Sequence, residues 1–269
     1  MATTRVTRLA ITRPPTAALA RCVLTYRKRE PVDVDLAIDQ HSRYERALES
    51  LGCTVLRLPL APDLPDAVFV EDAAVVLGDV AVVGRSAEPS RRAELPDVVR
   101  ALEPYCDLLW IREPGTLDGG DVLAHGRTLL VGRSSRTNDQ GVAQLREPAE
   151  SAGYRVQVLA VDRCLHLRTA LSSVGEGTLL VNPDWIDASD LDAAEVIAVD
   201  RAEPWGANAL RIGSTVIHPD SSRATRRLLE QSGIDVRPVP FSELEKAEAG
   251  VTCCSLIIEP SASEAATAR

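Results

Sequence analysis

The sequence lacks several features that would assign it to a membrane, secreted or metal-binding class of proteins. No apolar run approaches the roughly 20 residues that a membrane-spanning helix needs, and residues 1–15 lack the apolar centre of a signal peptide. No two cysteines have the two-residue gap of a zinc ribbon or a redox motif. We therefore expect a cytoplasmic protein whose six scattered cysteines are free thiols, most of them small buried side chains.

A surplus of basic residues is also missing. The chain has 30 Lys and Arg against 39 Asp and Glu, which gives a formal net charge of −9. This balance argues against nucleic acid or an anionic membrane as the main partner. It is compatible with a small cationic ligand, although most soluble proteins of this charge have none.

What the chain does contain is a repeat. A short apolar strand, a tight turn with glycine and a second apolar strand recur through the sequence. The turn pairs Gly-Asp, His-Gly, Gly-Glu and Gly-Ser each lie between two β-rich runs, which is typical of hairpins. The five copies lie near residues 68–84, 117–132, 171–182, 206–219 and 249–258.

Helical segments are expected between the copies. Residues 35–52 predict a helix that ends at the capping Gly52. Its apolar stripe consists of Ala37, Tyr44, Leu48 and Leu51. Residues 221–233 begin with a capping serine and end at a glycine. The repeating unit is therefore a strand, a hairpin and a helix.

Five mixed units without a linker between them imply one closed ring rather than five domains. No Pro/Ser/Gly-rich spacer or charge block divides residues 1–259, which we expect to form a single α/β domain, and only the tail 260–269 is expected to be disordered. In a ring, residues at matching places in different copies converge on the central axis. A doubly wound sheet is the competing fold, but no glycine-rich phosphate loop follows the first strand.

Three acidic residues surround a strand of the first copy. Asp66, Glu71 and Asp72 lie in an apolar stretch, where ionised carboxylates are costly to bury without partners. They could mark a strand end with its acids in solvent. The alternative is a pocket for a planar cation, because a guanidinium has several donors in a fixed geometry that suits two or three carboxylates.

Candidate catalytic groups occur at the edges of other copies. Asp118 and Asp121 lie in LDGGDV, where one of the two acids is expected to form the turn. His166 has apolar neighbours, a setting that is more often that of a core histidine. A ring would, however, bring a cysteine, a histidine and a carboxylate together, and that set can activate a thiol for nucleophilic attack.

The candidate thiols are the adjacent cysteines of AGVTCCSLII. In an extended strand, neighbouring side chains point to opposite faces, so Cys253 and Cys254 cannot both face the axis. Periodicity does not choose between them. The inward cysteine would be the nucleophile, and the other would be structural.

These residues resemble a known family. The motifs LPDAVFVEDAAVV, PSRR, TLDGGDVL, SRTN, LHLRT and GVTCCSL look like those of the dimethylarginine dimethylaminohydrolases, and the resemblance runs from about residue 5 to 258. It implies a five-bladed, pseudo-symmetric α/β propeller, the pentein fold of the guanidine-modifying superfamily, with the site on its axis. It also implies hydrolysis of Nω-methylated L-arginines to L-citrulline and dimethylamine or methylamine, through a covalent thiouronium on cysteine and without a metal or organic cofactor.

The resemblance also implies roles for individual residues. Cys253 would be the nucleophile and Cys254 its structural neighbour, His166 the general acid and base, and Asp118 the carboxylate that orients His166. The implied substrate contacts are Arg91 and Arg136 for the substrate carboxylate, Asp72 with the adjacent Glu71 for the guanidinium, and Asp66 with the backbone of Leu24 and Ala247 for the α-amino end.

One residue departs from the family pattern. Five residues before the nucleophile the family usually carries an Asp that touches the guanidinium, whereas this chain has Glu248. The extra methylene could intrude into the space for the N-methyl groups or shift the loop. Two related activities therefore remain as alternatives: an arginine deiminase acting on unmethylated or otherwise substituted arginine, and an amidinotransferase.

A non-catalytic propeller that binds arginine-like ligands belongs to a different class of function. It is disfavoured because a binding protein needs no nucleophile. The expected partner is a small-molecule substrate, a methylated arginine. Apolar outer surfaces could support a homodimer, although no apolar stripe demands one.

Overall fold

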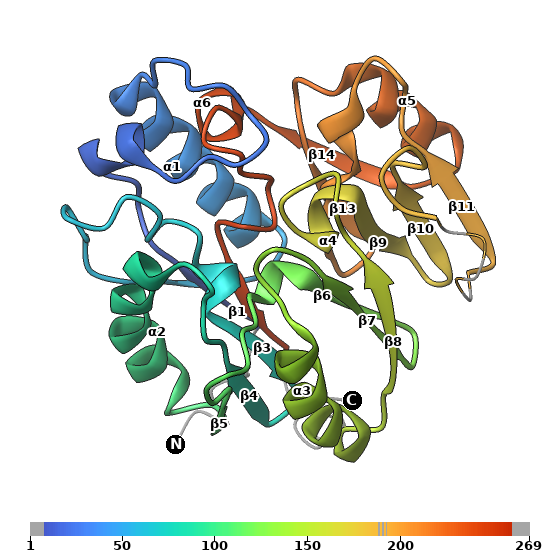
Figure 1. The fold of residues 1–269 in the computed structure, drawn as a ribbon. Helices are drawn as coiled ribbons and strands as arrows, with labels where there is room; N and C mark the ends of the chain where they lie inside the picture. Colours follow the sequence, from blue (N-terminus) through green and yellow to red (C-terminus); the bar gives the residue numbers. More distant parts are fainter. Residues whose placement is uncertain (1–7, 188, 190, 192, 260–269) are drawn as a thin grey trace, which may run out of the picture.

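Five small sheets of three strands each form a ring around a central axis (Figure 1). In this computed structural model the described residues are 8–187, 189, 191 and 193–259. The architecture is a five-bladed α/β propeller, which confirms the fold that the repeats and the resemblance predicted. Residues 1–7 and the predicted tail at 260–269 lie outside the described residues, so the predicted boundaries of the domain stay predictions.

Each blade contains one sheet, with an inner, a middle and an outer strand. In that order the blades are β15 (Leu256–Ile258), β1 (Leu9–Thr12) and β2 (Thr54–Arg57); β3 (Ala74–Leu77), β4 (Val80–Val83) and β5 (Asp107–Trp110); β6 (Val122–His125), β7 (Thr128–Arg133) and β8 (Arg155–Ala160); β9 (Leu171–Gly175), β10 (Thr178–Val181) and β11 (Glu195–Ala198); and β12 (Leu210–Ile212), β13 (Thr215–Pro219) and β14 (Asp235–Val239).

Helices connect the strands. The α-helices are α1 (Val34–Ser50), α2 (Leu95–Leu102), α3 (Asp139–Ser151), α4 (Leu167–Ala170), α5 (Arg223–Gln231) and α6 (Ser242–Glu245). The 3-10 helices are η1 (Ala17–Arg21), η2 (Val70–Ala73), η3 (Pro89–Glu94), η4 (Gly119–Asp121) and η5 (Pro204–Ala207). The longer helices, α1, α2, α3 and α5, cover the outside of the ring (Figure 1).

The hairpins of four blades turn at a glycine, which is the predicted one in three of them; in the blade of β9 the turn glycine is Gly177, because Gly175 of the predicted Gly-Glu pair belongs to β9. In every blade the middle strand is antiparallel to the inner strand and parallel to the outer one. Gly78, Gly126, Gly177 and Gly213 have φ values of 65°, 56°, 73° and 63°. Residues with a Cβ rarely adopt such values, so glycine sets these turns. The same type of turn therefore joins the inner strand to the middle strand in these four blades.

The fifth blade differs from the hairpin that the sequence predicted at 249–258. Residues 251–254 form a turn, and only β15 follows them; its antiparallel partner is β1, from the other end of the chain (Figure 1). The adjacent cysteines consequently lie in a turn and not in the extended strand that was expected. The reason is local hydrogen bonding, because the N–H of Cys253 donates to the carbonyl of Gly250 at 3.1 Å.

The predicted helices are present with two differences. Helix α1 begins after Asp33, whose side chain accepts the N–H of Leu36 at 3.0 Å. Helix α5 begins after Ser222, but that serine makes no side-chain capping bond. The described part of the connection between β10 and β11 contains no α-helix, so the unit of strand, hairpin and helix is incomplete in that blade.

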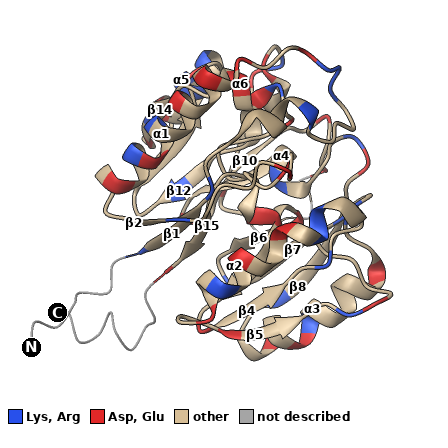
Figure 2. Ribbon diagram, turned by 90° about the vertical axis from the view of Figure 1, so that its left-hand side faces the viewer, with Lys and Arg blue, Asp and Glu red and all other residues tan. Residues whose placement is uncertain are grey.

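Apolar clusters fill the space between the sheets and the helices that cover them. Tyr44 and Phe241, both fully buried, pack edge to face at 5.9 Å in the cluster under α1. Figure 2 shows the charged residues along the outer helices α1, α2 and α5, while the strand ribbons are mostly tan. Among the described residues, no helix is long and apolar enough to cross a membrane.

Candidate active site

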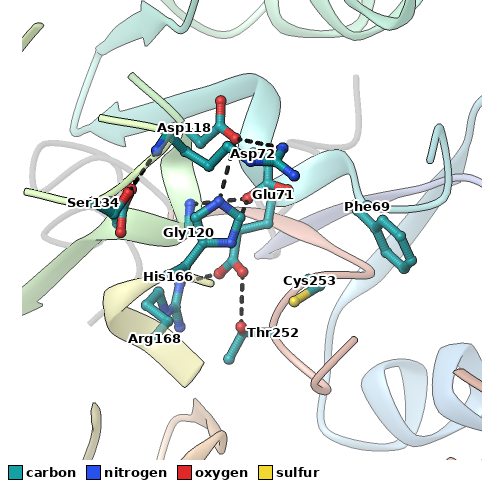
Figure 3. Close-up of polar contacts among 12 residues, drawn as sticks. Phe69, Glu71, Asp72, Asp118, Gly120, Ser134, His166, Arg168, Thr252 and Cys253 are labelled. Carbon is teal, nitrogen blue, oxygen red and sulfur yellow. Dashed lines mark hydrogen bonds and ion pairs between the residues drawn. The ribbon is translucent and has the colours of Figure 1, made fainter. Parts of the chain in front are cut away.

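The three predicted catalytic residues and Asp72, a predicted substrate contact, lie just before the inner strands of different blades. Asp72 lies in η2 before β3, and Asp118 directly precedes η4 and β6. His166 is the N-cap residue of α4 before β9, and Cys253 lies in the turn before β15. Because these are matching places in four blades, the ring brings them to the same end of the axis (Figure 3).

His166 is held between two buried carboxylates. Its Nε2 lies 3.2 Å from Oδ2 of Asp118, and its Nδ1 lies 3.8 Å from Oδ1 of Asp72. Burial opposes protonation of the imidazole, but the charges of Asp72, Asp118 and Asp121 outweigh it and raise the pKa of His166 to about 9. At neutral pH the ring is therefore an imidazolium, the form that can donate a proton to a leaving group.

Asp121 fixes the backbone next to His166. Its Oδ1 accepts the N–H of Leu167 at 2.9 Å, and its Oδ2 accepts the hydroxyl of Ser134 at 2.6 Å. Burial raises the pKa of this carboxyl to about 6. The sequence showed two acids in one motif, but it carried no signal that the second would bond to a residue 46 positions away.

Glu71 connects three blades beneath the cluster. Its Oε1 pairs with Arg168, and its Oε2 accepts the hydroxyl of Thr252 at 2.7 Å (Figure 3). Asn208 donates to the same Thr252 hydroxyl oxygen at 2.9 Å. Both oxygens of Glu71 thus have protein partners and support the turn that carries Cys253. Sequence reasoning missed these three partners, because no local pattern marks a contact between blades.

The two cysteines differ in exposure. Cys254 is 0% exposed and packs in the apolar cluster under α1, whereas Cys253 is partly exposed. The Sγ of Cys253 accepts the N–H of Gly250 at 3.4 Å, and its carbonyl accepts the N–H of Glu71 at 3.2 Å. Burial and the carboxylates of Glu71 and Asp72 raise the pKa of the Cys253 thiol well above its usual value. A cation bound beside the sulfur would oppose this effect and favour the thiolate.

The two predicted arginines are both buried at the cluster. Nη1 of Arg91 lies 2.6 Å from Oδ2 of Asp72, and its Nη2 lies 3.0 Å from Oε2 of Glu94. Nη1 of Arg136 lies 3.7 Å from Oδ2 of Asp118, but it has no hydrogen-bond partner among the described residues. Arg136 therefore has a donor that is free to receive an anion.

A loop at residues 23–29 contacts residues that belong to several blades. The N–H of Val23 donates to Asp66 at 3.1 Å. The hydroxyl of Tyr26 donates to the carbonyl of Asp162 at 3.3 Å. The guanidinium of Arg27 lies 4.3 Å from the ring centroid of Trp205. Burial raises the pKa of Asp66, whereas the hydrogen bond from the N–H of Val23 lowers it in part.

Glu248 contacts the loop at residues 23–29. Its carboxylate accepts the N–H groups of Thr25, at 2.9 Å, and of Tyr26 and Arg27. Its backbone has a φ of 60°, in the left-handed region that a non-glycine residue rarely adopts. The longer side chain therefore anchors the loop. Leu24 lies between the residues held by Asp66 and Glu248, and Ala247, which precedes Glu248, is 2% exposed.

Three side chains of the cluster could reach one metal ion. Ligand atoms of Asp72, Asp118 and His166 lie within 4.8 Å of one another. However, Asp118 is already bonded to His166, and Asp72 is bonded to Arg91. A metal would have to displace both partners, so the donor set suits proton transfer better than metal binding.

A separate cavity of about 470 Å³ lies along the axis among the inner strands β3, β6, β12 and β15. Glu71 and Arg168 line it together with Gly119. The Glu71–Arg168 pair therefore lies between this cavity and the cluster around His166.

Comparisons with known proteins agree with this geometry. No family model matches the chain. The dimethylarginine dimethylaminohydrolase of Streptomyces coelicolor is 39% identical to it over 249 residues, which cover 92% of this chain and 95% of that protein. The chain belongs to the dimethylarginine dimethylaminohydrolase family.

Solved structures support the family's fold. The dimethylarginine dimethylaminohydrolase of Pseudomonas aeruginosa, as a cysteine-to-serine variant complexed with citrulline, matches with a TM-score of 0.88 at 29% identity, over 94% of this chain and 100% of that one. The N-terminal domain of the arginine dihydrolase ArgZ matches with a TM-score of 0.85 at 21% identity, over 94% of this chain and 98% of that one. The second likeness supports the fold alone.

Proposed function

We propose that the chain is an amidine hydrolase that converts Nω-methylated L-arginines to L-citrulline and dimethylamine or methylamine. The observation that carries this proposal is the position of His166, 3.2 Å from Asp118 and grouped with a partly exposed cysteine at the end of the axis. Membership of the dimethylarginine dimethylaminohydrolase family supports the substrate class. So does the citrulline complex of the Pseudomonas aeruginosa relative.

The first half of the reaction forms a covalent intermediate on Cys253. The substrate guanidinium, held near Asp72, lowers the pKa of the thiol, which loses its proton to solvent, and the resulting thiolate attacks the guanidinium carbon. His166 gives its proton to the methylated nitrogen as the C–N bond breaks. Dimethylamine or methylamine leaves, and the carbon remains bonded to sulfur as a cationic thiouronium.

The second half hydrolyses this intermediate. His166, now neutral, takes one proton from a water molecule that attacks the same carbon. The C–S bond then breaks, the sulfur keeps the second proton of the water, and citrulline is released. Asp118 holds the imidazole in place for both transfers through its 3.2 Å contact with Nε2. The pKa of about 9 lets His166 begin the cycle protonated.

Recognition of the amino-acid end would use Arg136 and Arg91 for the carboxylate. Asp66 and the backbone of Leu24 and Ala247 would bind the α-amino group. Arg136 supports this assignment because its Nη1 is buried without a hydrogen-bond partner among the described residues. A buried unpaired donor is unfavourable, so a bound carboxylate would satisfy it.

The position of Glu248 favours methylated substrates over arginine. Its carboxylate is bound to the loop at residues 25–27, so the extra methylene does not enter the space around Asp72. An arginine deiminase and an amidinotransferase share the same covalent chemistry, and the experiment below separates them from the proposed hydrolase.

The test compares substrates for one preparation of the enzyme. Asymmetric dimethylarginine, monomethylarginine and arginine are incubated separately, and citrulline is measured by chromatography. We expect citrulline from the methylated substrates at a higher kcat/KM than from arginine. A clear preference for arginine would make the chain a deiminase. Transfer of the amidino group to added glycine, without citrulline, would make it a transferase.

We also propose that the protein is cytoplasmic and that it can form a homodimer. All six cysteines are free thiols, which suits a reducing compartment. Leu109 and Trp110 on the outer strand β5 are 45% and 43% exposed, so this strand offers apolar surface that a second copy could cover. Sedimentation of the purified protein would give its oligomeric state.

A further inference from the structure

The guanidinium of Arg91 is bound by protein groups on several sides. The residue is 6% exposed. Its Nη1 donates to Asp72 at 2.6 Å, and its Nε donates to Glu94 at 3.2 Å. Its Nη2 donates to Glu94 at 3.0 Å and to the carbonyl of Phe69 at 3.2 Å. In this position Arg91 has few N–H groups left to bind a substrate carboxylate.

Asp72 is occupied in the same way. Its Oδ1 accepts the N–H of Gly120 at 3.1 Å, and its Oδ2 holds Arg91. The void that Asp72, Arg91 and Asp118 line has a volume of about 10 Å³, close to that of one water-sized probe. A substrate guanidinium has the same head group as Arg91, so the two must compete for Asp72.

Neighbouring groups offer Arg91 another position. Glu94 belongs to the same 3-10 helix and holds Nε and Nη2, so the two side chains can move together as a pair when Nη1 leaves Asp72. Nη1 of Arg91 lies 4.0 Å from Oδ2 of Asp118, and the open Nη1 of Arg136 lies 3.7 Å from the same atom. A carboxylate that enters beside both arginines would satisfy Arg136 and replace Asp72 as the partner of Arg91.

We propose that Arg91 occupies Asp72 as an internal guanidinium until the α-carboxylate of the substrate draws it away. The guanidinium site then opens only to ligands that also carry a carboxylate; the substrate class in this statement rests on the proposed function. A ligand that has a guanidinium but no carboxylate offers Arg91 no new partner. If such a ligand displaced Arg91 from Asp72, the buried positive charge of Arg91 would lose one of the carboxylates that balance it. The exchange thus couples recognition of the two ends of the substrate and rejects decarboxylated analogues.

The alternative is that Arg91 binds the substrate carboxylate from its present position. In that case its removal would weaken the binding of arginine-like ligands that carry a carboxylate and would leave other guanidinium ligands unaffected. Agmatine, which is arginine without its carboxylate, distinguishes the two cases.

The experiment measures agmatine affinity by titration calorimetry and KM for asymmetric dimethylarginine by citrulline formation. We expect Arg91→Ala to bind agmatine at least tenfold more tightly than the wild type and to have a KM at least tenfold higher. The matched control is Arg136→Ala, which removes the same charge but not the group on Asp72. It should raise KM without tightening agmatine binding. Unchanged agmatine affinity in Arg91→Ala, or equal tightening in both variants, overturns the exchange.

Glu94→Gln provides a second test that does not depend on the folding of Arg91→Ala. It removes one of the two carboxylates that hydrogen-bond Arg91, so Arg91 stays more firmly on Asp72 and agmatine affinity should fall. A rise in agmatine affinity would contradict the exchange. If the wild type forms no citrulline from any arginine, the proposed function fails, whereas the agmatine titrations still decide whether Arg91 competes for Asp72.

Discussion

Nε2 of His166 lies 3.2 Å from Oδ2 of Asp118, and the two residues are 4% and 0% exposed. At such burial a single carboxylate has a large effect on a neighbouring imidazole, because little water screens the charge. Together with Asp72, whose charge is the largest effect that raises the pKa of His166, Asp118 therefore favours the protonated imidazole, and its hydrogen bond orients the ring.

Removing the charge of Asp118 should lower the pKa of His166. We expect Asp118→Asn to shift the pKa of His166 downward from about 9 and to reduce kcat for asymmetric dimethylarginine by roughly 10²–10⁴-fold, the range usual for a lost general acid and base. The pKa is measured by NMR titration of the imidazole. A variant with an unchanged pKa and normal turnover would show that Asp118 does not act through His166.

The raised pKa of His166 should also make stability depend on pH. A histidine whose pKa rises from 6.5 to about 9 on folding contributes stability that is fully present below pH 6.5 and is lost as the pH rises through 9. The difference in unfolding free energy between the wild type and His166→Asn should therefore shrink between pH 6 and pH 10. Urea titrations at both pH values measure it; a difference that grows with pH would contradict the sign.

Substitution of the two adjacent cysteines should have different effects, one on catalysis and the other on stability. Cys253→Ser should abolish citrulline formation, because a serine hydroxyl in this acidic setting is not ionised. Cys254→Ser should keep most of the turnover but lose about 1–3 kcal/mol of stability, since it buries a hydroxyl in an apolar cluster. Initial rates and thermal unfolding give both numbers. Loss of turnover in Cys254→Ser alone would identify the other sulfur as the nucleophile.

Glu248 should affect substrate affinity through the loop at residues 23–29. Glu248→Asp shortens the side chain by one methylene, so it should lose the N–H groups of residues 25–27 and free the loop. We expect KM to rise at least fivefold with a smaller change in kcat. Glu245→Gln, which alters a nearby acid bonded to Ser221 instead, is the control. A lower KM in Glu248→Asp would mean that the shorter acid binds the guanidinium directly.

The sequence predicted the ring because its evidence was local and repeated. Hairpin glycines such as Gly78 and the apolar stripe of α1 are set by nearby residues, and four blades follow them directly. The hairpin predicted for the fifth blade was wrong. Its strand β15 pairs with β1 from the opposite end of the chain, and no local pattern marks that pairing.

The cluster was predictable in its members but not in its contacts. Cys253, His166 and Asp118 follow from the family motifs, and the structure brings His166 and Asp118 together. By contrast, the contact of Glu248 with the loop and the contact of Arg91 with Asp72 are made by side chains that reach residues far away in the sequence. The spacing of residues along the chain predicts neither contact, because the length and rotamer of one side chain decide which group it reaches.

Gly120 should be required for the shape of the cluster. A Cβ at this position would lie 2.7 Å from Oδ1 of Asp72 and 2.9 Å from Nδ1 of His166, closer than real Cβ atoms come. Gly120→Ala should therefore push both groups apart and reduce kcat/KM at least a hundredfold, since displacements of about 1 Å can cost that much. Gly213→Ala is the control, because its Cβ meets nothing within 4 Å and only its φ of +63° is unfavourable. The control should lose about 1–2 kcal/mol of stability and keep its activity per folded molecule; a Gly120→Ala enzyme with normal kcat/KM would mean that Asp72 and His166 need not stay this close for turnover.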